Sequence, residues 1–350
     1  MATIAKRTVP RLAKIHKPQV DDRCVSDALY GLYALPSILV AYKMGLFELL
    51  ENGGLTSKEI AAKLNLAVRP TDALLACSAS LGFVGAKRGR FLLTRSGAVY
   101  MLKSSPFYRG PFLDFYIANS AAFSIQTLEK SLRSDSAHGP QGSEWIAMQT
   151  EQEHFARNFT HVMHSQGIAA AMGWPNKVNL SRNSVFLDIG GGSGAHAIGA
   201  LLRWKRLNAI VFDIATVCEV AADYARKYGL QDRIITHSGD MWIDQFPSAD
   251  VHFYSQIFHD WSPTKCRELT EKSFSSLKPG GRLIVHEMLL NNSKTGPMAT
   301  AGMSMTMMAW TQGQQFTGSE LVAMLSDAGF RSLQVKPAFG YWSIVTGVKP

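Results

Sequence analysis

The chain has 350 residues, of which 46% are hydrophobic and 18% are charged, and its formal net charge at pH 7 is +9. This composition supports a folded core and excludes a disordered chain, and the length suits roughly two domains. No apolar run reaches the roughly 20 residues of a membrane span, and no apolar signal segment follows Met1. We therefore expect a cytoplasmic protein that is not bound to a membrane.

The first 20 residues form a basic leader, which supplies five of the nine net positive charges and has no acid before Asp21. Its cations are Lys6, Arg7, Arg11, Lys14 and Lys17. A flexible, solvated tail is the simplest interpretation, with a targeting leader or a nucleic-acid arm as alternatives.

Four cysteines are far apart in the sequence and form no CxxC pair. They are Cys24, Cys77, Cys218 and Cys266. This spacing indicates reduced thiols in an intracellular protein rather than a disulfide framework.

Residues 21–110 have the pattern of one small helical domain. An apolar helix is expected at 28–41, where it should be buried, and Thr56 or Ser57 should cap the next helix. A further helix at 70–81 and a hairpin at 83–94 complete a winged helix. Residues 69–80 offer few side chains that read base edges, so this domain is expected to serve packing or dimerisation rather than DNA binding.

Residues 111–175 are predicted to form a helical connector, interrupted by a polar loop at 134–142. His154, His161 and His164 have helical spacing, but no carboxylate completes a metal site. Phe159 and Met163 share one helix face, which is either core or part of a substrate pocket.

From residue 176 to the end, strands and helices alternate, which predicts a doubly wound parallel sheet. The expected strands are 185–189, 209–213, 233–237, 250–255 and 282–286, and the expected helices are 195–203, 215–228 and 263–277. Two last strands, 332–335 and 341–348, are joined by a short link and must pair antiparallel. The fold class is therefore α/β, a Rossmann-like parallel sheet closed by an antiparallel C-terminal hairpin, with the winged-helix domain before it.

A glycine turn at 190–194 follows the apolar strand 185–189, and Asp213 ends the next strand. Glycines permit positive φ angles and let a ligand approach the backbone, while an aspartate can accept hydrogen bonds from a ribose. The helix that begins near Ala195 favours a negative group at its N-terminus. The turn predicts a nucleoside-type cofactor, either a nicotinamide dinucleotide or S-adenosylmethionine. The C-terminal hairpin favours S-adenosylmethionine.

The chain also resembles the class I S-adenosylmethionine-dependent O-methyltransferases, a family that includes caffeate-type, acetylserotonin-type and bacterial natural-product enzymes. The resemblance extends over nearly the whole chain after the leader. It rests on motifs at 188–194, 211–213, 238–241, 258–262 and 277–282, of which His259-Asp260-Trp261 is the strongest. This family dimerises through its winged helix, so the resemblance implies a homodimer that acts on a small molecule and not on nucleic acid.

The resemblance implies a role for each matching residue. His259 would be the general base that removes a proton from the acceptor hydroxyl, and Glu287 would orient it. No metal would be needed. The cofactor residues would be Asp188, Gly190, Gly192, Asp213, Gly239, Asp240, Met241 and Ser255.

One departure from the family pattern concerns catalysis. The family commonly has a second glutamate where this chain has Gln315, and a cation where it has Phe316. Gln315 can hydrogen-bond His259 but cannot stabilise an imidazolium by charge. Weakened base catalysis, an acidic acceptor, or non-methylating chemistry on the same cofactor are open alternatives, as is methylation at nitrogen or carbon.

Methionines and a tryptophan gather just before this departure and are either core or acceptor wall. With Phe159 and Met163, the candidate acceptor residues are Met303, Thr306, Met307 and Trp310. Met305 and Met308 belong to the same stretch. A wall of this kind would suit a flat aromatic or polyketide-like acceptor.

Overall fold

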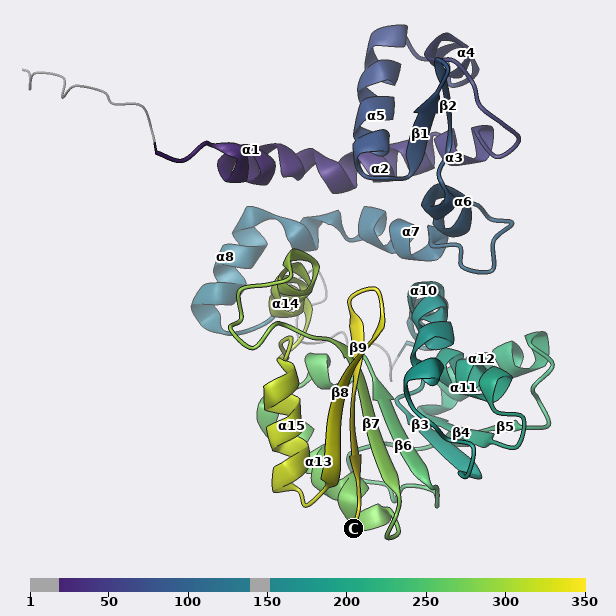
Figure 1. Cartoon of the computed structure of the whole chain (residues 1–350), viewed down its shortest axis with the longest axis vertical. Coiled ribbons are helices and arrows are strands. Elements are labelled where there is room, and N and C mark those ends of the chain that lie inside the picture. The colour runs from purple at the N-terminus through teal and green to yellow at the C-terminus, as the bar shows by residue number, and fades with distance from the viewer. Residues whose placement is uncertain (1–18, 139–151) are drawn as a thin grey trace, which may run out of the picture. The chain divides into compact units, whose positions relative to one another are not determined.

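A computed structural model describes residues 19–138 and 152–350, which divide into two compact units, one ending at Ala98 and the other running from Val99 to Pro350. In Figure 1 the first unit is drawn in purple and dark blue, and the second in lighter blue through teal and green to yellow. Nearly all of the basic leader, and the second half of the predicted loop at 134–142, lie outside the described residues.

The first unit begins with the helices α1 (Arg23–Tyr30), η1 (Gly31–Tyr33), α2 (Ala34–Lys43) and α3 (Leu46–Leu49). The expectation of a buried apolar helix at 28–41 is wrong for this unit, because Tyr30 and Leu32 are 72% and 69% exposed. Within α2, only Ile38 and Ala41 are buried. The unit does not provide enough apolar surface to cover both sides of the helix.

The expectation that no apolar run is long enough to span a membrane does not hold for one segment of the described residues. By length and composition alone, the helical segment Arg23–Lys43 qualifies, with a mean hydropathy of 1.5, and 11% of its apolar window is buried. It breaks into three helices, and proximity to the N-terminus makes such a segment weak support for a membrane span.

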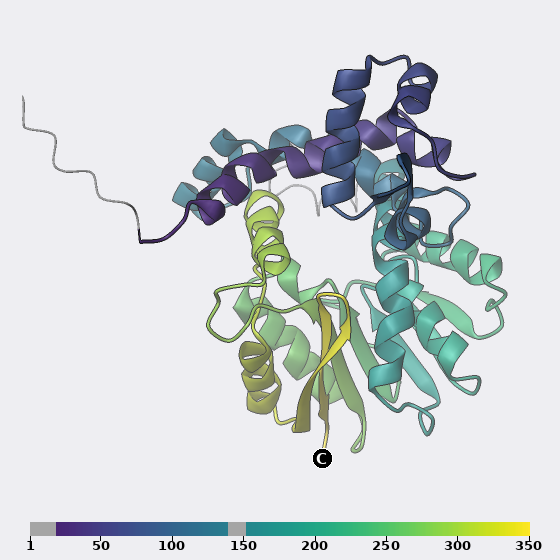
Figure 2. The ribbon, with the colours of Figure 1, turned by 45° about the horizontal axis from the view of Figure 1, so that its top comes forward.

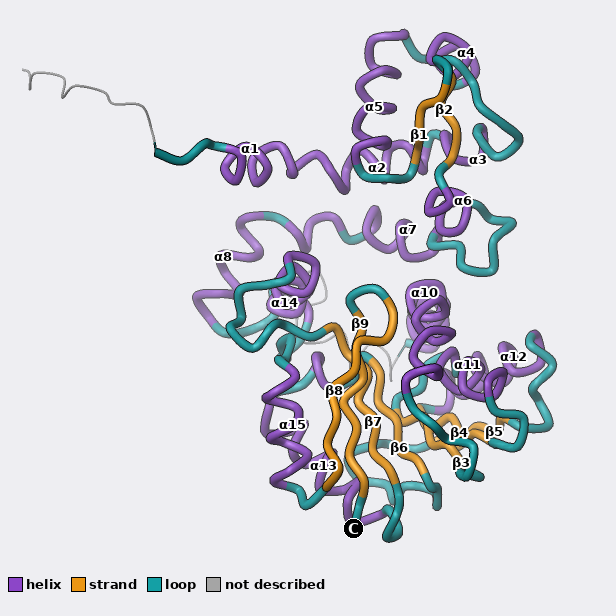
Figure 3. The backbone as a smooth tube through the Cα atoms, viewed as in Figure 1, coloured by secondary structure: helices purple, strands orange, loops and turns teal. Residues whose placement is uncertain are grey.

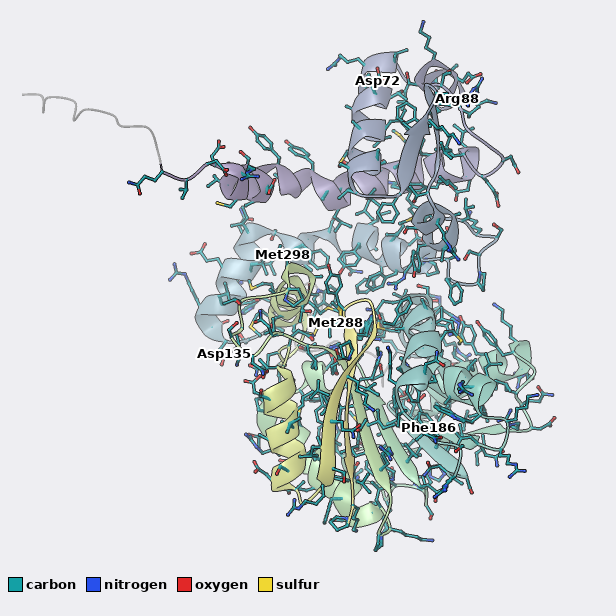
Figure 4. The ribbon with its side chains drawn as sticks, in the orientation of Figure 1. Asp72, Arg88, Asp135, Phe186, Met288 and Met298 are labelled. Carbon is teal, nitrogen blue, oxygen red and sulfur yellow. The ribbon has the colours of Figure 1, made fainter. Side chains whose placement is uncertain are left out.

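The rest of the first unit confirms the winged-helix pattern. Thr56 caps α4 (Ser57–Lys63) in a capping box with Glu59. Helix α5 (Val68–Ser80) follows, and β1 (Val84–Lys87) pairs antiparallel with β2 (Arg90–Leu93). Arg88 lies in the turn of this hairpin, at a φ of 51° (Figure 4). Helix α6 (Arg95–Met101) leads out of the unit.

The second unit opens with helices, as predicted. They are α7 (Gly110–Ala118), η2 (Ser120–Phe123), α8 (Ile125–Ser134), α10 (Glu153–Gly173) and η4 (Trp174–Lys177). Helix α10 is the longest and packs beside α11 (Ala195–Arg203) in both views (Figure 2).

A seven-stranded sheet forms the centre of this unit, with strand order β5-β4-β3-β6-β7-β9-β8 (Figure 3). The first five strands in this order are parallel, and β9 pairs antiparallel with both β7 and β8. The strands are β3 (Val185–Ile189), β4 (Asn208–Asp213), β5 (Ile234–Ser238), β6 (Val251–Ser255), β7 (Arg282–Met288), β8 (Arg331–Phe339) and β9 (Trp342–Val348). The predicted mixed sheet with a C-terminal hairpin is confirmed.

Helices cover both faces of the sheet. On one face, α10, α11 and α12 (Ala215–Lys227) enclose a core that contains Trp174, Phe186 and Ile344. Phe186 on β3 is labelled in Figure 4. On the other face, α13 (Pro263–Ser276) and α15 (Gly318–Asp327) pack over a core that contains Phe316. Helix α14 (Met298–Trp310) lies beyond the carboxyl ends of the strands.

The strand order reverses direction between β3 and β6. From β3 the chain adds β4 and β5 on one side, and then β6 and β7 on the other. Connections that leave in opposite directions open a crevice at the carboxyl ends of the strands, where ligands of such sheets bind. The topology therefore places a binding site beside the glycine turn.

Candidate active site

A cavity of about 330 Å³ lies at this crevice. One wall, the strand-end wall, comes from the ends of four adjacent parallel strands, at Gly190, Asp213, Asp240 and Ser255. Its other wall comes from side chains of α7, η2, α10 and α14. The cavity volume is within the usual range for small-molecule sites.

The glycine turn adopts the backbone conformation that its sequence predicts. Gly190, Gly192 and Gly194 have φ angles of 62°, 55° and 71°, which other residues rarely adopt. At Gly190 a Cβ would meet Ile257 at 2.5 Å, whereas at Gly192 nothing lies within 4 Å. The backbone at Gly192 therefore faces open space in the cavity, with room for a ligand to approach.

Asp213 is held at the end of β4 by two backbone N–H groups. Gly192 donates to Oδ2 at 2.9 Å and Ile214 donates to Oδ1 at 2.8 Å. Burial raises the Asp213 pKa, and these hydrogen bonds offset the rise only in part, leaving it at about 6. Each carboxylate oxygen keeps a lone pair that can accept from a further donor, such as a hydroxyl.

Asp188 is the one predicted cofactor residue that does not line the cavity. It is 1% exposed, and its Oδ2 accepts the N–H of Ala197 at 3.1 Å in the first turn of α11. Burial raises its pKa well above the usual value. In the structure it secures the junction between the glycine turn and α11.

The other predicted cofactor residues all line the cavity. Asp240 and Met241 follow β5, and Asp240 Oδ1 accepts the N–H of Trp242 at 2.8 Å. Ser255 Oγ lies 2.8 Å from Nδ1 of His286, which is fully buried.

His259 lies in η5 (Phe258–Asp260) and lines the cavity, although it is only 4% exposed. Its Nδ1 lies 2.9 Å from Oε2 of Glu287 at an angle unsuited to a hydrogen bond, and its backbone N–H donates to Oε1 at 3.4 Å. On the other side of the ring, Nε2 lies 3.6 Å from Asp260 Oδ1. The imidazole therefore lies between a buried carboxylate, Glu287, and a partly exposed one, Asp260, and of the two only Asp260 lines the cavity.

These carboxylates control the protonation of His259. Burial lowers its pKa, but Glu287 and Asp260 outweigh burial and raise the pKa to about 9. Burial also raises the pKa of Asp260 to about 7, against the opposing effect of His259.

Gln315 is buried but does not line the cavity. Within the described residues its carboxamide has no hydrogen-bond partner, so it does not form the bond to His259 of which its side chain is capable. Its backbone N–H donates to Ser304 Oγ at 3.3 Å. Phe316 is 2% exposed and packs in the core over α13 and α15, where a cation would be buried without a partner.

All six candidate acceptor residues line the cavity. They are Phe159, Met163, Met303, Thr306, Met307 and Trp310. Met305 and Met308 do not line it, and Met305 is 39% exposed.

Sequence reasoning missed much of the aromatic wall. Phe115 on α7 contacts the rings of Tyr116, Phe159 and Trp310 at centroid distances of 6.3, 6.0 and 5.4 Å. Phe123 on η2 stacks on Tyr116 at 4.9 Å. The only signal was the density of aromatic residues at 112–123, which is compatible with a core helix as well.

A buried polar group beside the glycine turn was also missed. Gln166 and His196 line the cavity, and His164 Nδ1 lies 2.8 Å from Ser193 Oγ. Gln166 Oε1 and His196 Nδ1 have no hydrogen-bond partner within the described residues. Buried polar atoms without partners are expected where a polar ligand completes the site.

Family models match most of the chain. An O-methyltransferase domain matches residues 125–331, and an O-methyltransferase dimerisation domain matches residues 27–103.

Individual proteins of known activity match over nearly their full length. The chain is 29% identical over 328 residues to a 3-hydroxy-5-methyl-1-naphthoate 3-O-methyltransferase of Streptomyces sahachiroi, covering 93% of this chain and 94% of the relative. It is 28% identical over 337 residues to the acetylserotonin O-methyltransferase of Gallus gallus, covering 91% and 95%.

A solved structure is similar as well. The crystal structure of human N-acetylserotonin methyltransferase in complex with S-adenosylmethionine superposes with a TM-score of 0.78 and 25% identity. The match covers 95% of this chain and 99% of the other.

Proposed function

The chain belongs to the S-adenosylmethionine-dependent O-methyltransferases of small molecules, and from that premise we propose that it methylates a hydroxyl of a flat aromatic acceptor with His259 as the base. The observation that supports this most strongly is the position of His259, between Glu287 and the cavity.

The cavity fits the cofactor at its strand-end wall. Gly192 leaves open space, Asp213 offers acceptors for a ribose, and Gln166 and His196 present polar atoms that lack partners. Asp240 and Met241 would contact the adenine, and Ser255 with Gly190 would face the methionine end. S-adenosylmethionine would supply a methyl group bonded to a sulfonium sulfur, and the neutral thioether S-adenosylhomocysteine would be the leaving group.

His259 would remove the proton from the acceptor hydroxyl as the oxygen attacks the methyl carbon. A phenol ordinarily has a pKa of about 10, so an imidazole with a pKa of about 9 is well matched to accept its proton. The proton would move to Nε2, and Glu287 beside Nδ1 would stabilise the imidazolium. The positive charge of the S-adenosylmethionine sulfonium would lower the His259 pKa when the cofactor is bound, which would favour the neutral imidazole that acts as the base.

The acceptor would lie against the aromatic wall. Phe115, Phe159 and Trp310 form a continuous set of ring contacts, and flat aromatic molecules pack well against such surfaces. The relatives include one enzyme named for a hydroxynaphthoate and one named for acetylserotonin, which are both aromatic. We infer an aromatic acceptor of one or two fused rings.

The first unit would form a homodimer. The match to a dimerisation domain and the exposed apolar side chains of Leu29, Tyr30, Leu32 and Tyr33 support this assignment. We propose that residues 21–110 dimerise, 111–175 connect and contribute to the acceptor pocket, and 176–350 bind the cofactor.

Transfer of a labelled methyl group from S-adenosylmethionine to a panel of phenols, hydroxynaphthoates and hydroxyindoles tests the proposal. We expect a product heavier by one methyl, with the label on oxygen by NMR. Label on carbon or nitrogen would contradict O-methylation, and no label transfer to any acceptor in the panel would contradict the aromatic acceptor.

A further inference from the structure

A second cleft lies over β7 and the edge strand β8, and it shares no residue with the active-site cavity. On the sheet it extends from Arg282, at the start of β7, to Lys336 of β8, which is level with His286 through Ile344 of β9. Residues from η4, the end of α11, β7 and β8 line it. They are Pro175, Asn176, Lys177, Val178, Asn179, Ser181, Arg203, Trp204, Arg282, Gln334 and Lys336.

The charge of this lining is entirely positive. It contains four cations and no carboxylate. The neutral polar residues are two asparagines, a serine and a glutamine, which all have hydrogen-bond donors. The cleft is therefore rich in donors from four separate elements of the fold.

Strand register places the sheet residues of the cleft on one face. Arg282 pairs with Val348, Gln334 with Thr346, and Lys336 with Ile344. These partners alternate along β9, so their side chains point to the same side of the sheet. Ile344 packs in the core beneath Trp174 and Trp204, so this side is the one covered by η4 and α11.

The four cations lack the partners that other cations of this unit have. Arg157, Arg226 and Lys294 each form an ion pair with a glutamate or an aspartate. Within the described residues, Lys177, Arg203, Arg282 and Lys336 form none. Asp250, whose backbone carbonyl accepts from Arg282, uses its Oδ2 for the N–H groups of Ser184 and Val185.

Two of the cations are also held in place. Arg282 is half-buried at the start of β7, and its desolvation lowers the guanidinium pKa. Lys336 Nζ donates to the carbonyl of Lys177 at 3.1 Å, which links β8 to η4. A partly desolvated guanidinium without a carboxylate is unfavourable in the free protein, and an anion in the cleft would relieve this.

We propose that this cleft binds a small anion that carries two or more phosphoryl groups. Arginine forks pair bidentately with phosphoryl oxygens, and lysines add positive charge at a distance that flexible side chains can adjust. Four unpaired cations match an anion of several charges better than a monocarboxylate. The proposal is independent of methyl transfer, because no residue of the cleft lines the active-site cavity.

Calorimetric titration of the full-length protein with inorganic pyrophosphate tests the proposal, with ADP as a second arm. Binding by both indicates recognition of the diphosphate itself, whereas binding by ADP alone would indicate that the nucleoside contributes. We expect dissociation constants in the micromolar to low millimolar range that weaken as salt is raised. No saturable binding by either ligand would overturn the proposal.

Single variants locate the site. We expect Arg203→Gln and Lys336→Gln to weaken pyrophosphate binding by about tenfold each, as the loss of a charge-assisted hydrogen bond predicts. Arg95→Gln and Lys58→Gln remove the same charges from exposed positions of the first unit and should change it less than about twofold. Equal weakening by both pairs would show that net charge alone attracts the anion, and would overturn the site.

Arg282→Gln should weaken pyrophosphate binding more than Arg203→Gln or Lys336→Gln, but it can also destabilise the fold because Arg282 is half-buried. S-adenosylhomocysteine binding and methyl transfer should stay at the wild-type level in Arg203→Gln and Lys336→Gln, which shows that they fold. A loss of pyrophosphate binding together with unchanged methyl transfer supports the second site. Wild-type pyrophosphate binding in these two exposed variants would overturn it, whatever Arg282→Gln shows.

Discussion

The two walls of the active-site cavity are built differently. The strand-end wall consists of the last residues of β4 and β6 and of the turns that directly follow β3 and β5, including the glycine turn. The opposite wall consists of long side chains from four helical elements spread over residues 112–310. One wall is determined by local sequence and sheet topology, and the other by tertiary packing.

This difference corresponds to a division of labour. A cofactor that is the same in every turnover would need fixed contacts, and the glycine turn with positive φ angles and the carboxylate held by two N–H groups have fixed positions. A wall of Phe, Met and Trp side chains can be changed one residue at a time without moving the sheet. His259 lies where the two walls meet, so the walls can be tested separately from the chemistry.

His259→Ala should have the largest effect, because it removes the proposed base while leaving both walls intact. We expect kcat to fall by about 10²- to 10⁴-fold. Binding of S-adenosylhomocysteine, measured by calorimetry, should change less than about threefold. Wild-type kcat in this variant would remove His259 from the mechanism.

Asp213→Ala should damage the strand-end wall alone. Loss of the ribose acceptors should raise the dissociation constant of S-adenosylhomocysteine by about 10- to 100-fold. Asp223→Ala is the control, because this aspartate lies exposed on α12 and pairs with Arg226. If both variants bind S-adenosylhomocysteine equally, Asp213 does not hold the cofactor.

Phe115→Ala should damage the helical wall alone. Phe115 contacts three other rings, and its loss should raise the KM of the acceptor by about tenfold while S-adenosylhomocysteine binds normally. Met298→Ala, at an 83% exposed position on α14, should leave the KM unchanged (Figure 4). An effect of Phe115→Ala confined to cofactor binding would reverse the assignment of the walls.

A smaller effect is expected from a matched pair of methionines on α14. Met307 is 7% exposed and lines the cavity, whereas Met305 is 39% exposed and does not. Met307→Ala should raise the acceptor KM by about three- to tenfold through lost apolar contact, and Met305→Ala should not. Steady-state kinetics with one acceptor suffices, and equal KM values would place the acceptor away from α14.

The contrast between the walls also explains what the sequence could predict. The glycine turn, Asp213 and the C-terminal hairpin follow from local patterns, because strand periodicity and turn residues directly set backbone geometry. The order of motifs identified the family, which the comparisons confirm. The sequence identified Met307 and Trp310 only as candidates, because apolar side chains in a core helix and in a pocket wall have the same pattern.

Residues that depend on tertiary packing were missed or placed differently. Phe115 and Phe123 reach the cavity only because α7 and η2 fold over it, which no local signal encodes. Gln315 could hydrogen-bond His259 according to the sequence, but its amide is buried, does not line the cavity and has no partner among the described residues. The apolar helix at 28–41 was expected to be buried, but its surface stays exposed within the unit, where a second copy of the chain would cover it.

The central claim is that His259, held by Glu287, accepts the proton of the acceptor hydroxyl. The pH dependence of kcat/KM in the wild type and in Glu287→Gln, with one acceptor, tests it most directly. Because the His259 pKa is raised to about 9, the wild-type rate should increase with pH and level off near or below pH 9. Removing the Glu287 charge lowers that pKa, so the rise in Glu287→Gln should move to lower pH and reach a lower plateau. A pH profile that is unchanged by Glu287→Gln would contradict the account.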